Sequence, residues 1–88
     1  MSNLGMLYCH SVQDLPAPLP YYKIEVGMWY YYHRYFVNDD WNIDIKESDT
    51  IWTRNILTFR EEDMSSWFWD RVQFRDRRIV EILEGLGE

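Results

Sequence analysis

The side chains that could carry chemistry in this chain are one cysteine, two histidines and fifteen carboxylates. Cys9 and His10 are neighbours in a stretch that alternates like a β-strand, so their side chains should point to opposite faces of a sheet. A nucleophile needs a base within hydrogen-bonding reach, and this placement does not provide one. We interpret Cys9 as a small buried thiol and His10 as an ordinary histidine.

The carboxylates include two obvious groups, Asp39-Asp40 and Glu61-Glu62-Asp63. The first group lies in a turn signal and the second at a predicted helix start, where acids serve solvation and capping. Acid–base catalysis needs a buried or coupled carboxylate with a shifted pKa, and neither position suggests burial. His33, beside Arg34, has no activated serine or cysteine near it and is interpreted as a hydrogen-bonded surface histidine. The sequence also lacks a glycine-rich phosphate loop and the CxxC and HExxH motifs, so we expect no enzyme, no cofactor and no metal site.

The element that positions the aromatic side chains is a predicted central strand over residues 21–37, YYKIEVGMWYYYHRYFV. Apolar or amphipathic residues occupy its even positions, with Arg34 as the exception, so this face should point into the core. Gly27 predicts a bulge or bend, and the segment is either one long bent strand or two strands that meet there. Beyond Gly27 the opposite face presents four rings, which either pack under the C-terminal helix or a loop, or form a surface for a partner. These four are Trp29, Tyr31, His33 and Tyr35.

Alternation and turn residues predict further strands at residues 4–12, 41–46 and 51–59. A proline-rich connector, residues 13–20, links the first strand to the central one. Strand 41–46 should form an antiparallel hairpin with the end of the central strand, because Asn38-Asp39-Asp40 is a turn signal. Its inward side chains should be Trp41, Ile43 and Ile45, and its outward side chains should be Asn42, Asp44 and Lys46.

The C-terminal segment predicts a helix over about residues 62–84, because apolar residues recur there near helical spacing. Thr58 and Glu61 fit a capping box that would start it, and Asp63 and Ser65 are rival N-caps. Residues 66–74 also alternate, so another strand followed by a helix from about Asp76 is the alternative, and we favour the longer helix. The predicted fold is α+β, a single domain of residues 1–88: a small antiparallel sheet of about four strands with a C-terminal helix packed on one face.

Composition limits the partners that this chain can bind. Aromatic residues make up 18% of 88 residues, so either the core is unusually aromatic or some rings are shared with a partner. The net charge of −6 opposes direct binding to nucleic acid or to an anionic membrane, and it permits a protein partner with a basic surface. A single cysteine allows no internal disulfide, and no signal peptide or membrane span is visible, so we expect a cytoplasmic, intracellular protein.

These observations favour a non-enzymatic protein-binding module. We expect a small acidic inhibitor of a basic or nucleic-acid-handling protein complex, of the kind that phages use against host defence or for host takeover. The first alternative is a structural homodimer or assembly subunit that uses the aromatic strand face, and the second is a small ligand-binding protein or enzyme. The predicted partner-binding residues are four outward rings and an acidic rim in the turns: Trp29, Tyr31, His33, Tyr35, Asp39, Asp40, Asp44, Glu47 and Asp49.

Overall fold

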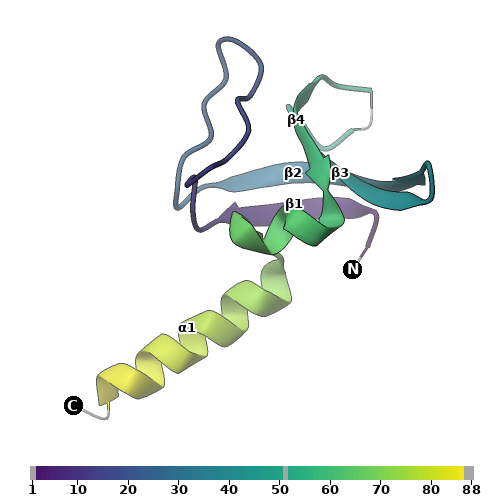
Figure 1. The fold of residues 1–88 in the computed structure, drawn as a ribbon. Helices are drawn as coiled ribbons and strands as arrows, with labels where there is room; N and C mark the ends of the chain where they lie inside the picture. The colour runs from purple at the N-terminus through teal and green to yellow at the C-terminus, as the bar shows by residue number, and fades with distance from the viewer. Residues whose placement is uncertain (1, 51, 87–88) are drawn as a thin grey trace.

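The described part of the chain folds into five β-strands, one 3-10 helix and one α-helix (Figure 1). The structure, a computed structural model, describes residues 2–50 and 52–86, and of Leu86 only the backbone. This confirms the predicted α+β class, with five strands in place of about four. The elements in order are β1 (Leu4–Cys9), β2 (Trp29–Val37), β3 (Asp40–Lys46), β4 (Asn55–Arg60), the 3-10 helix η1 (Glu61–Ser66), β5 (Phe68–Trp69) and α1 (Arg71–Leu86).

The five strands form one curled antiparallel sheet in the order β4-β3-β2-β1-β5. We call the core side of the sheet its inner face and the opposite side its outer face. Ile24 from the β1–β2 loop, Met64 from η1 and the neighbouring Trp67 close over the inner face. The core of buried apolar side chains consists of Leu7, Cys9, Ile24, Tyr32, Ile43, Ile45, Ile56, Leu57, Phe59, Met64, Trp67 and Phe68.

The predicted central strand is shorter than expected. Only Trp29–Val37 pairs as a strand, and residues 21–28 belong to the β1–β2 loop, so both a long bent strand and two strands meeting near Gly27 are wrong. Gly27 has a φ of 92°, which turns the chain there into the sheet. Tyr32 is buried as its even position predicted, whereas Phe36 is exposed near the end of the hairpin.

Strands β3 and β4 follow the sequence more closely. Ile43 and Ile45 are fully buried, as predicted for strand 41–46, and β3 starts one residue earlier. Predicted strand 51–59 is shortened to Asn55–Arg60, and Ile51 lies outside the described residues. The register shifts between Ile45 and Lys46, and this irregularity lets the consecutive residues Ile56 and Leu57 both be buried. At the N-terminal side, β1 ends at Cys9 and not at residue 12.

The predicted long helix over residues 62–84 is wrong at its start. Phe68 pairs with Cys9 in the sheet and is fully buried, so residues 68–69 form β5 and interrupt helical structure. The helix begins at Arg71, behind a capping box different from the predicted Thr58–Glu61 pair. Asp70 accepts a hydrogen bond from the Gln73 amide (2.8 Å), and the Gln73 side chain accepts one from the Asp70 amide (3.0 Å).

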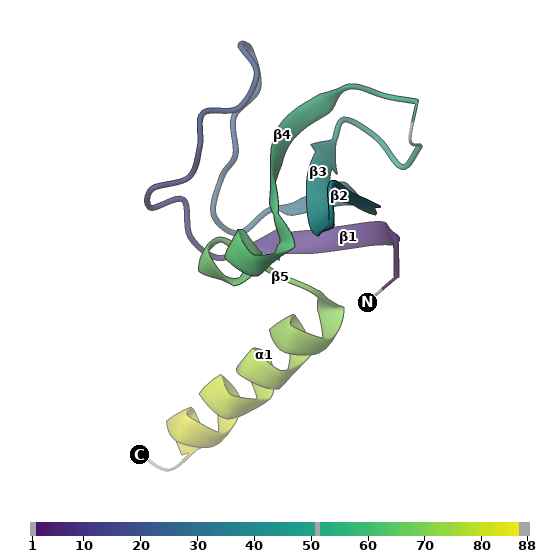
Figure 2. The ribbon, with the colours of Figure 1, turned by 45° about the vertical axis from the view of Figure 1, so that its right-hand side comes forward.

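Helix α1 contacts the sheet through Phe74 and Arg77 near its N-terminal end and then leaves it (Figure 2). It starts beside β1 and β5 and then projects away from the body of the protein. The predicted packing of the helix on one sheet face is therefore limited to its N-terminal end. Phe74 is the half-buried residue of α1, and residues 75–85 are exposed.

Candidate functional site

The four predicted outward rings all lie on the outer face of β2. The antiparallel register pairs Trp29 with Tyr8 and Tyr31 with Met6 of β1, and places His33 opposite Leu4. Alternate side chains of a strand point to opposite faces, so these pairs share the outer face while Tyr30 and Tyr32 turn to the core. The outer face thus carries a row of apolar and aromatic side chains. Trp29 contacts the helix, and Tyr35 contacts Asp44 of β3.

Trp29 belongs to an aromatic cluster that anchors α1. Its ring lies 5.4 Å from Tyr8 and 5.0 Å from Phe74 of the helix, between ring centroids. Phe74 also contacts Tyr8 at 4.6 Å, and Trp69 stacks on Tyr8 at 6.0 Å. Such contacts between rings stabilise the fold by more than the burial of their apolar area alone. Of the two alternatives for the outward rings, packing under the helix therefore holds for Trp29.

Asp44 forms a buried polar centre with Tyr35. Only 5% of Asp44 is exposed, and its Oδ1 accepts hydrogen bonds from the Tyr35 hydroxyl (3.0 Å) and the Thr58 hydroxyl (2.7 Å). Burial raises the pKa of the Tyr35 hydroxyl, and the hydrogen bond to the Asp44 carboxylate raises it further. His33 stacks on Tyr35 at 5.3 Å. The predicted outward direction of Asp44 is correct, because it lies opposite His33 on the outer face. The prediction that Asp44 contacts a partner is wrong, because side chains from β2 and β4 cover it.

Lys46 also faces the outer side of β3 and is only 6% exposed. Its ammonium group donates a hydrogen bond to the Asn55 side chain. The predicted outward direction of Lys46 is correct, although its side chain is buried on that face. Asp44 and Lys46 are two residues apart in β3, and both are buried. The outer face of the sheet therefore contains a small buried polar region.

The predicted acidic rim does not form one surface. Asp39 and Asp40 lie at the β2–β3 turn, whereas Glu47 and Asp49 follow the other end of β3, roughly 20 Å away at 3.4 Å per strand residue. Glu47 accepts a hydrogen bond from Tyr22 (2.8 Å), which raises the pKa of that tyrosine. Asp44 lies between the two groups and is buried.

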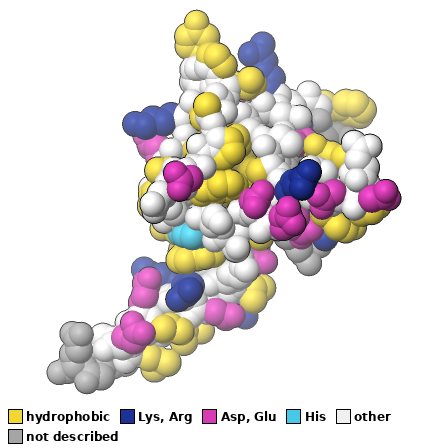
Figure 3. All heavy atoms as spheres, viewed as in Figure 1, with side chains coloured by type: hydrophobic (Ala, Val, Ile, Leu, Met, Phe, Trp, Pro, Cys, Tyr) yellow, Lys and Arg dark blue, Asp and Glu magenta, His cyan; other side chains and the backbone are white. Residues whose placement is uncertain are grey.

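The fold instead gathers a different set of acids, which we call the acidic end: Asp39, Asp40, Glu61, Glu62 and Asp63. The register pairs Asn42 with Arg60, which brings the residues after β4 beside the residues before β3. Arg60 lies 3.4 Å from Asp40 and 3.5 Å from Glu62, so a single guanidinium links the turn to η1. Figure 3 shows acidic side chains gathered on the body above α1. Sequence reasoning missed this set because its two groups are more than twenty residues apart in the chain, and only the pairing of β3 with β4 joins them.

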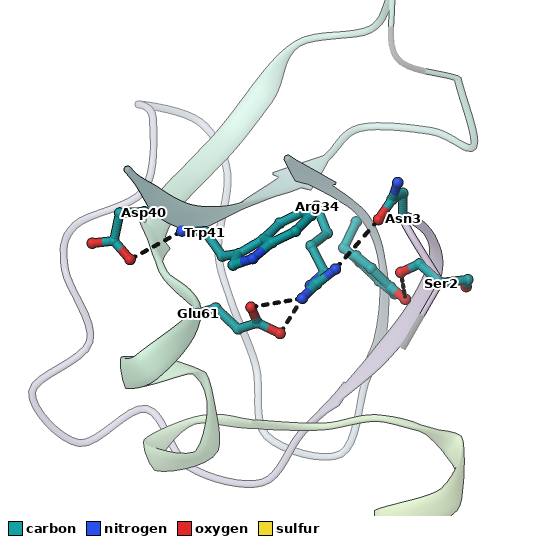
Figure 4. Close-up of polar contacts among 7 residues, drawn as sticks. Ser2, Asn3, Arg34, Asp40, Trp41 and Glu61 are labelled. Atoms are coloured by element: carbon teal, nitrogen blue, oxygen red, sulfur yellow. Dashed lines mark hydrogen bonds and ion pairs between the residues drawn. The ribbon is translucent and has the colours of Figure 1, made fainter. Parts of the chain in front are cut away.

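Arg34 organises the inner side of the acidic end (Figure 4). Its guanidinium makes two hydrogen bonds to the Glu61 carboxylate, at 2.8 and 3.0 Å, and stacks over the Trp41 ring at 3.7 Å from the ring centroid. A weaker bond at 3.4 Å reaches Asn3. This explains the one cation on the core face of β2: it is partly buried, and it is both paired and stacked. Glu61 is therefore bound within the protein, and Asp39, Glu62 and Asp63 are the exposed acids of this end.

Helix α1 carries an exposed apolar row that we call the helix stripe: Val72, Ile79, Ile82 and Leu83. Ile79, Ile82 and Leu83 are 49%, 57% and 62% exposed. At 3.6 residues per turn the stripe spans an arc of about 100° around the helix axis. Phe74 and Ile79 are five residues apart, which places them about 140° apart around that axis. The helix therefore attaches to the sheet through Phe74 and turns its main apolar side away from the sheet, where Figure 3 shows hydrophobic side chains along its free side.

A hollow lies at the base of α1, and we call it the base groove. Its volume is about 450 Å³. Leu4 and Met6 of the sheet and Val72 of the helix supply apolar walls, and Arg71 supplies a cation. Gly5 forms part of the wall, where a larger side chain would meet the Tyr32 ring at 3.1 Å. Val72 lies in both the base groove and the helix stripe, so the stripe begins at the groove. The exposed side chains of Arg75 and Asp76 lie between Val72 and Ile79 on the same side of the helix.

Cys9 and His10 lie on opposite sides of the sheet, as their alternation predicted. Cys9 is fully buried in the core, and this burial raises the pKa of its thiol. His10 stacks on Trp69 at 4.2 Å, and its Nε2 lies 2.8 Å from the Ser65 carbonyl oxygen. Within residues 2–50 and 52–86, no three histidine, cysteine or carboxylate side chains come together as a metal site.

The fold and these surfaces define a small α+β protein with an exposed apolar helix and an acidic end. The chain matches no protein-family model, no curated protein and no solved structure. In the described part of the chain, no helix combines the length and the apolar character needed to cross a lipid bilayer.

Proposed function

We propose that this chain is a non-enzymatic protein-binding module and that the helix stripe with the base groove is its binding element. The observation that carries the proposal is that α1 attaches through Phe74 and leaves Ile79, Ile82 and Leu83 in water. Burying one such side chain fully is favourable by about 1.5–3 kcal/mol. A row of apolar side chains on a projecting helix is the arrangement by which an amphipathic helix binds the groove of another protein.

The limited packing of α1 supports a bound state as its working form. In proteins most of the stability of a helix comes from packing of its apolar face, and residues 75–85 of α1 are exposed. Packing on the sheet stabilises only the N-terminal turns of α1. A partner surface that covers the stripe would therefore stabilise the remaining turns most. A partner that buries the stripe would stabilise both the helix and the complex.

The titratable groups fit binding better than catalysis. The pKa values of Cys9 and Tyr35 are raised mainly by burial, and that of Tyr22 mainly by its hydrogen bond to Glu47. Each shift keeps the group protonated, whereas an activated nucleophile or base needs the opposite direction.

The acidic end adds a second surface, and its chemistry suits a basic partner. Asp39, Glu62 and Asp63 are exposed there, and the whole chain has a net charge of −6. Complementary charge speeds association and orients the partner. A role as an acidic inhibitor of a nucleic-acid-handling complex stays a prediction that rests on this charge and on the small size of the chain.

The test is a tagged pull-down from a nuclease-treated lysate of the source cell, with the bound proteins identified by mass spectrometry. The wild-type chain should retain a partner in stoichiometric amount, and Ile79→Asp should lose it, because a carboxylate cannot be buried unpaired in an apolar contact. Val12→Asp is the matched control, since Val12 is an exposed valine outside α1. Equal retention by the wild type and Ile79→Asp would show that the helix stripe is not the binding element.

A further inference from the structure

We infer that the open edge of β1 over residues 4–7, which we call the free edge, binds an extended peptide segment of a partner protein. The segment adds a strand to the sheet along the base groove and places an acidic side chain beside Arg71. This inference rests on the proposed function, because the base groove is part of the proposed binding element. It follows from the direction of the backbone groups of β1, from the walls of the groove and from the charge of Arg71.

The side of β1 that faces away from β2 is covered over only part of its length. On that side β5 pairs with Tyr8 and Cys9, and within residues 2–50 and 52–86 no strand pairs with residues 4–7 there. A strand edge without a neighbour presents a row of backbone donors and acceptors. Another chain in extended conformation can bind such a row as an added strand.

The backbone groups that point out of the free edge belong to Leu4 and Met6. The Cys9 amide donates a hydrogen bond to a carbonyl just before β2 (3.0 Å), and the Asn3 carbonyl accepts one from an amide of β2 (2.7 Å). Successive residues of a strand direct these groups to opposite sides, so Leu4 and Met6 direct theirs away from β2. The Ser2 hydroxyl donates to the Leu4 carbonyl (2.7 Å). Among the described residues, this leaves the Leu4 amide and both backbone groups of Met6 without a hydrogen-bond partner.

The opposite edge of the sheet, along β4, is closed by the β1–β2 loop. The Leu19 amide donates to the Ile56 carbonyl of β4 (2.9 Å), and residues 16–20, which include three prolines, lie beside the strand. Proline has no N–H, so this segment offers little to a further strand. The free edge has no such cover, and its residues 4–7 include neither a proline nor a charged residue, which commonly protect an edge.

The base groove leaves room for one extended chain beside the free edge. Strand β1 forms one wall of the groove, and Asp70, Arg71 and Val72 at the start of α1 form the other (Figure 2). Adjacent strands of a sheet lie about 4.8 Å apart, so a peptide strand paired with the free edge would lie within this groove. Because α1 closes the far side, the groove accepts a single segment and not the edge of a second sheet. This selects a peptide over the sheet of a second copy.

Arg71 indicates which side chain the peptide carries opposite Met6. The two residues line the base groove together, and they also line a second hollow beside the aromatic cluster on the outer face. The peptide residue opposite Met6 points to that same face, because paired residues of neighbouring strands share a face. Arg71 forms no ion pair with another described residue, and the Asp70 carboxylate accepts a hydrogen bond from the Gln73 amide (2.8 Å). An acidic side chain at this position would therefore pair with Arg71.

The first experiment measures amide hydrogen exchange of the full-length chain by NMR. In the free chain, the amides of Leu4 and Met6 should be protected at least about tenfold less than those of Gly5 and Leu7, which point toward β2. Equal protection of the four amides would show that the edge is already covered, and the inference would be wrong.

The second experiment selects binders from a displayed library of random short peptides, and the enriched sequences are synthesised. They should carry an acid at one fixed position, and their binding should increase the protection of the Leu4 and Met6 amides at least about tenfold. N-methylation should weaken binding at every second peptide amide, because alternate amides of an added strand bond to its neighbour. A library that yields no binder, or binders that leave these two amides unprotected, would overturn the inference.

Two matched pairs of variants test the backbone and the charge separately. Leu4→Pro removes an amide at the first residue of β1, where proline is tolerated, and should weaken peptide binding at least about tenfold. Leu4→Ala keeps the amide and should weaken binding less than about threefold. Arg71→Glu should change the selected acid to a base, whereas Arg78→Glu, about two turns further along the helix, should not. Circular dichroism checks folding. Equal effects within either pair would contradict the proposed pairing.

The outcomes separate this inference from the proposed function. If no peptide binds the free edge but Ile79→Asp still abolishes capture from the lysate, the helix stripe stands as the binding element and the inference fails. If a peptide binds the free edge and Leu4→Pro abolishes capture while Ile79→Asp does not, the inference stands and the helix stripe is not the binding element. If no peptide binds and neither variant changes capture, both proposals fail.

Discussion

Asp44 lies at an outward position of an alternating strand, yet it is almost fully buried. The strand pattern correctly placed Ile43 and Ile45 in the core, because alternation depends only on the backbone. It could not indicate that Tyr35 and Thr58, from the two flanking strands, would both donate to the same carboxylate oxygen. That contact needs the register of three strands, which no local pattern contains. Asp44 therefore serves the stability of the sheet, and a charge reversal there would test folding and not partner binding.

The prediction for this residue is a loss of stability. Asp44→Ala should lower the free energy of unfolding by about 2 kcal/mol, because the hydroxyls of Tyr35 and Thr58 lose their acceptor in a partly buried place. Urea denaturation followed by tryptophan fluorescence measures it. Asp49→Ala is the control, since Asp49 is exposed in the β3–β4 loop, and it should change the same quantity by less than about 0.5 kcal/mol. Similar values for the two variants would contradict the structural role of Asp44.

At the level of elements, the sequence predicted best where contacts are local. The β2–β3 hairpin was expected from Asn38-Asp39-Asp40, and Asn38 and Asp39 indeed both have positive φ, 52° and 60°, as a tight hairpin turn requires. Residues 66–74 were predicted less well, because Phe68 satisfies both a helical and a strand pattern. Phe68 pairs with Cys9, which is 59 residues away in the chain, and this pairing makes the segment strand β5 rather than helix. The base groove and the acidic end could not be predicted for the same reason, since each joins segments from distant parts of the sequence.

The distal turns of helix α1 should contribute little to the stability of the fold. Deleting the chain from Arg78 onward retains Phe74 and also Arg77, whose guanidinium lies 5.7 Å from the centroid of the Trp69 ring. The removed residues 78–85 are exposed. The free energy of unfolding should change by less than about 0.5 kcal/mol, measured at a concentration low enough for the chain to be monomeric. Phe74→Ala in the full chain should cost more, about 2 kcal/mol, because it removes the ring that packs on Tyr8 and Trp29. A large loss on deletion would mean that the distal turns pack on their own sheet.

For the whole molecule, the arrangement of surfaces matters more than the net charge. The acidic end lies at the β2–β3 turn and η1, while α1 begins beside β1 and β5 and carries four arginines in its first half. The chain thus presents an acidic region on its body and a basic first half on its helix. A partner bound through α1 would leave the acidic end free, because no residue of the helix stripe or base groove belongs to it.

The acidic end should therefore govern the rate at which a basic protein partner associates. Asp39→Lys with Asp63→Lys should lower the association rate constant for a basic partner recovered from the lysate about tenfold at low ionic strength. The dissociation rate should change little, and the difference should shrink as salt is added, because exposed charges are screened. Stopped-flow fluorescence of the intrinsic tryptophans measures both rates. Glu25→Lys with Asp49→Lys makes the same change in net charge in two loops away from this end, so it separates a local effect from a general one. If the two double variants slow association equally, the effect belongs to the net charge of −6 and the acidic end has no special part in binding.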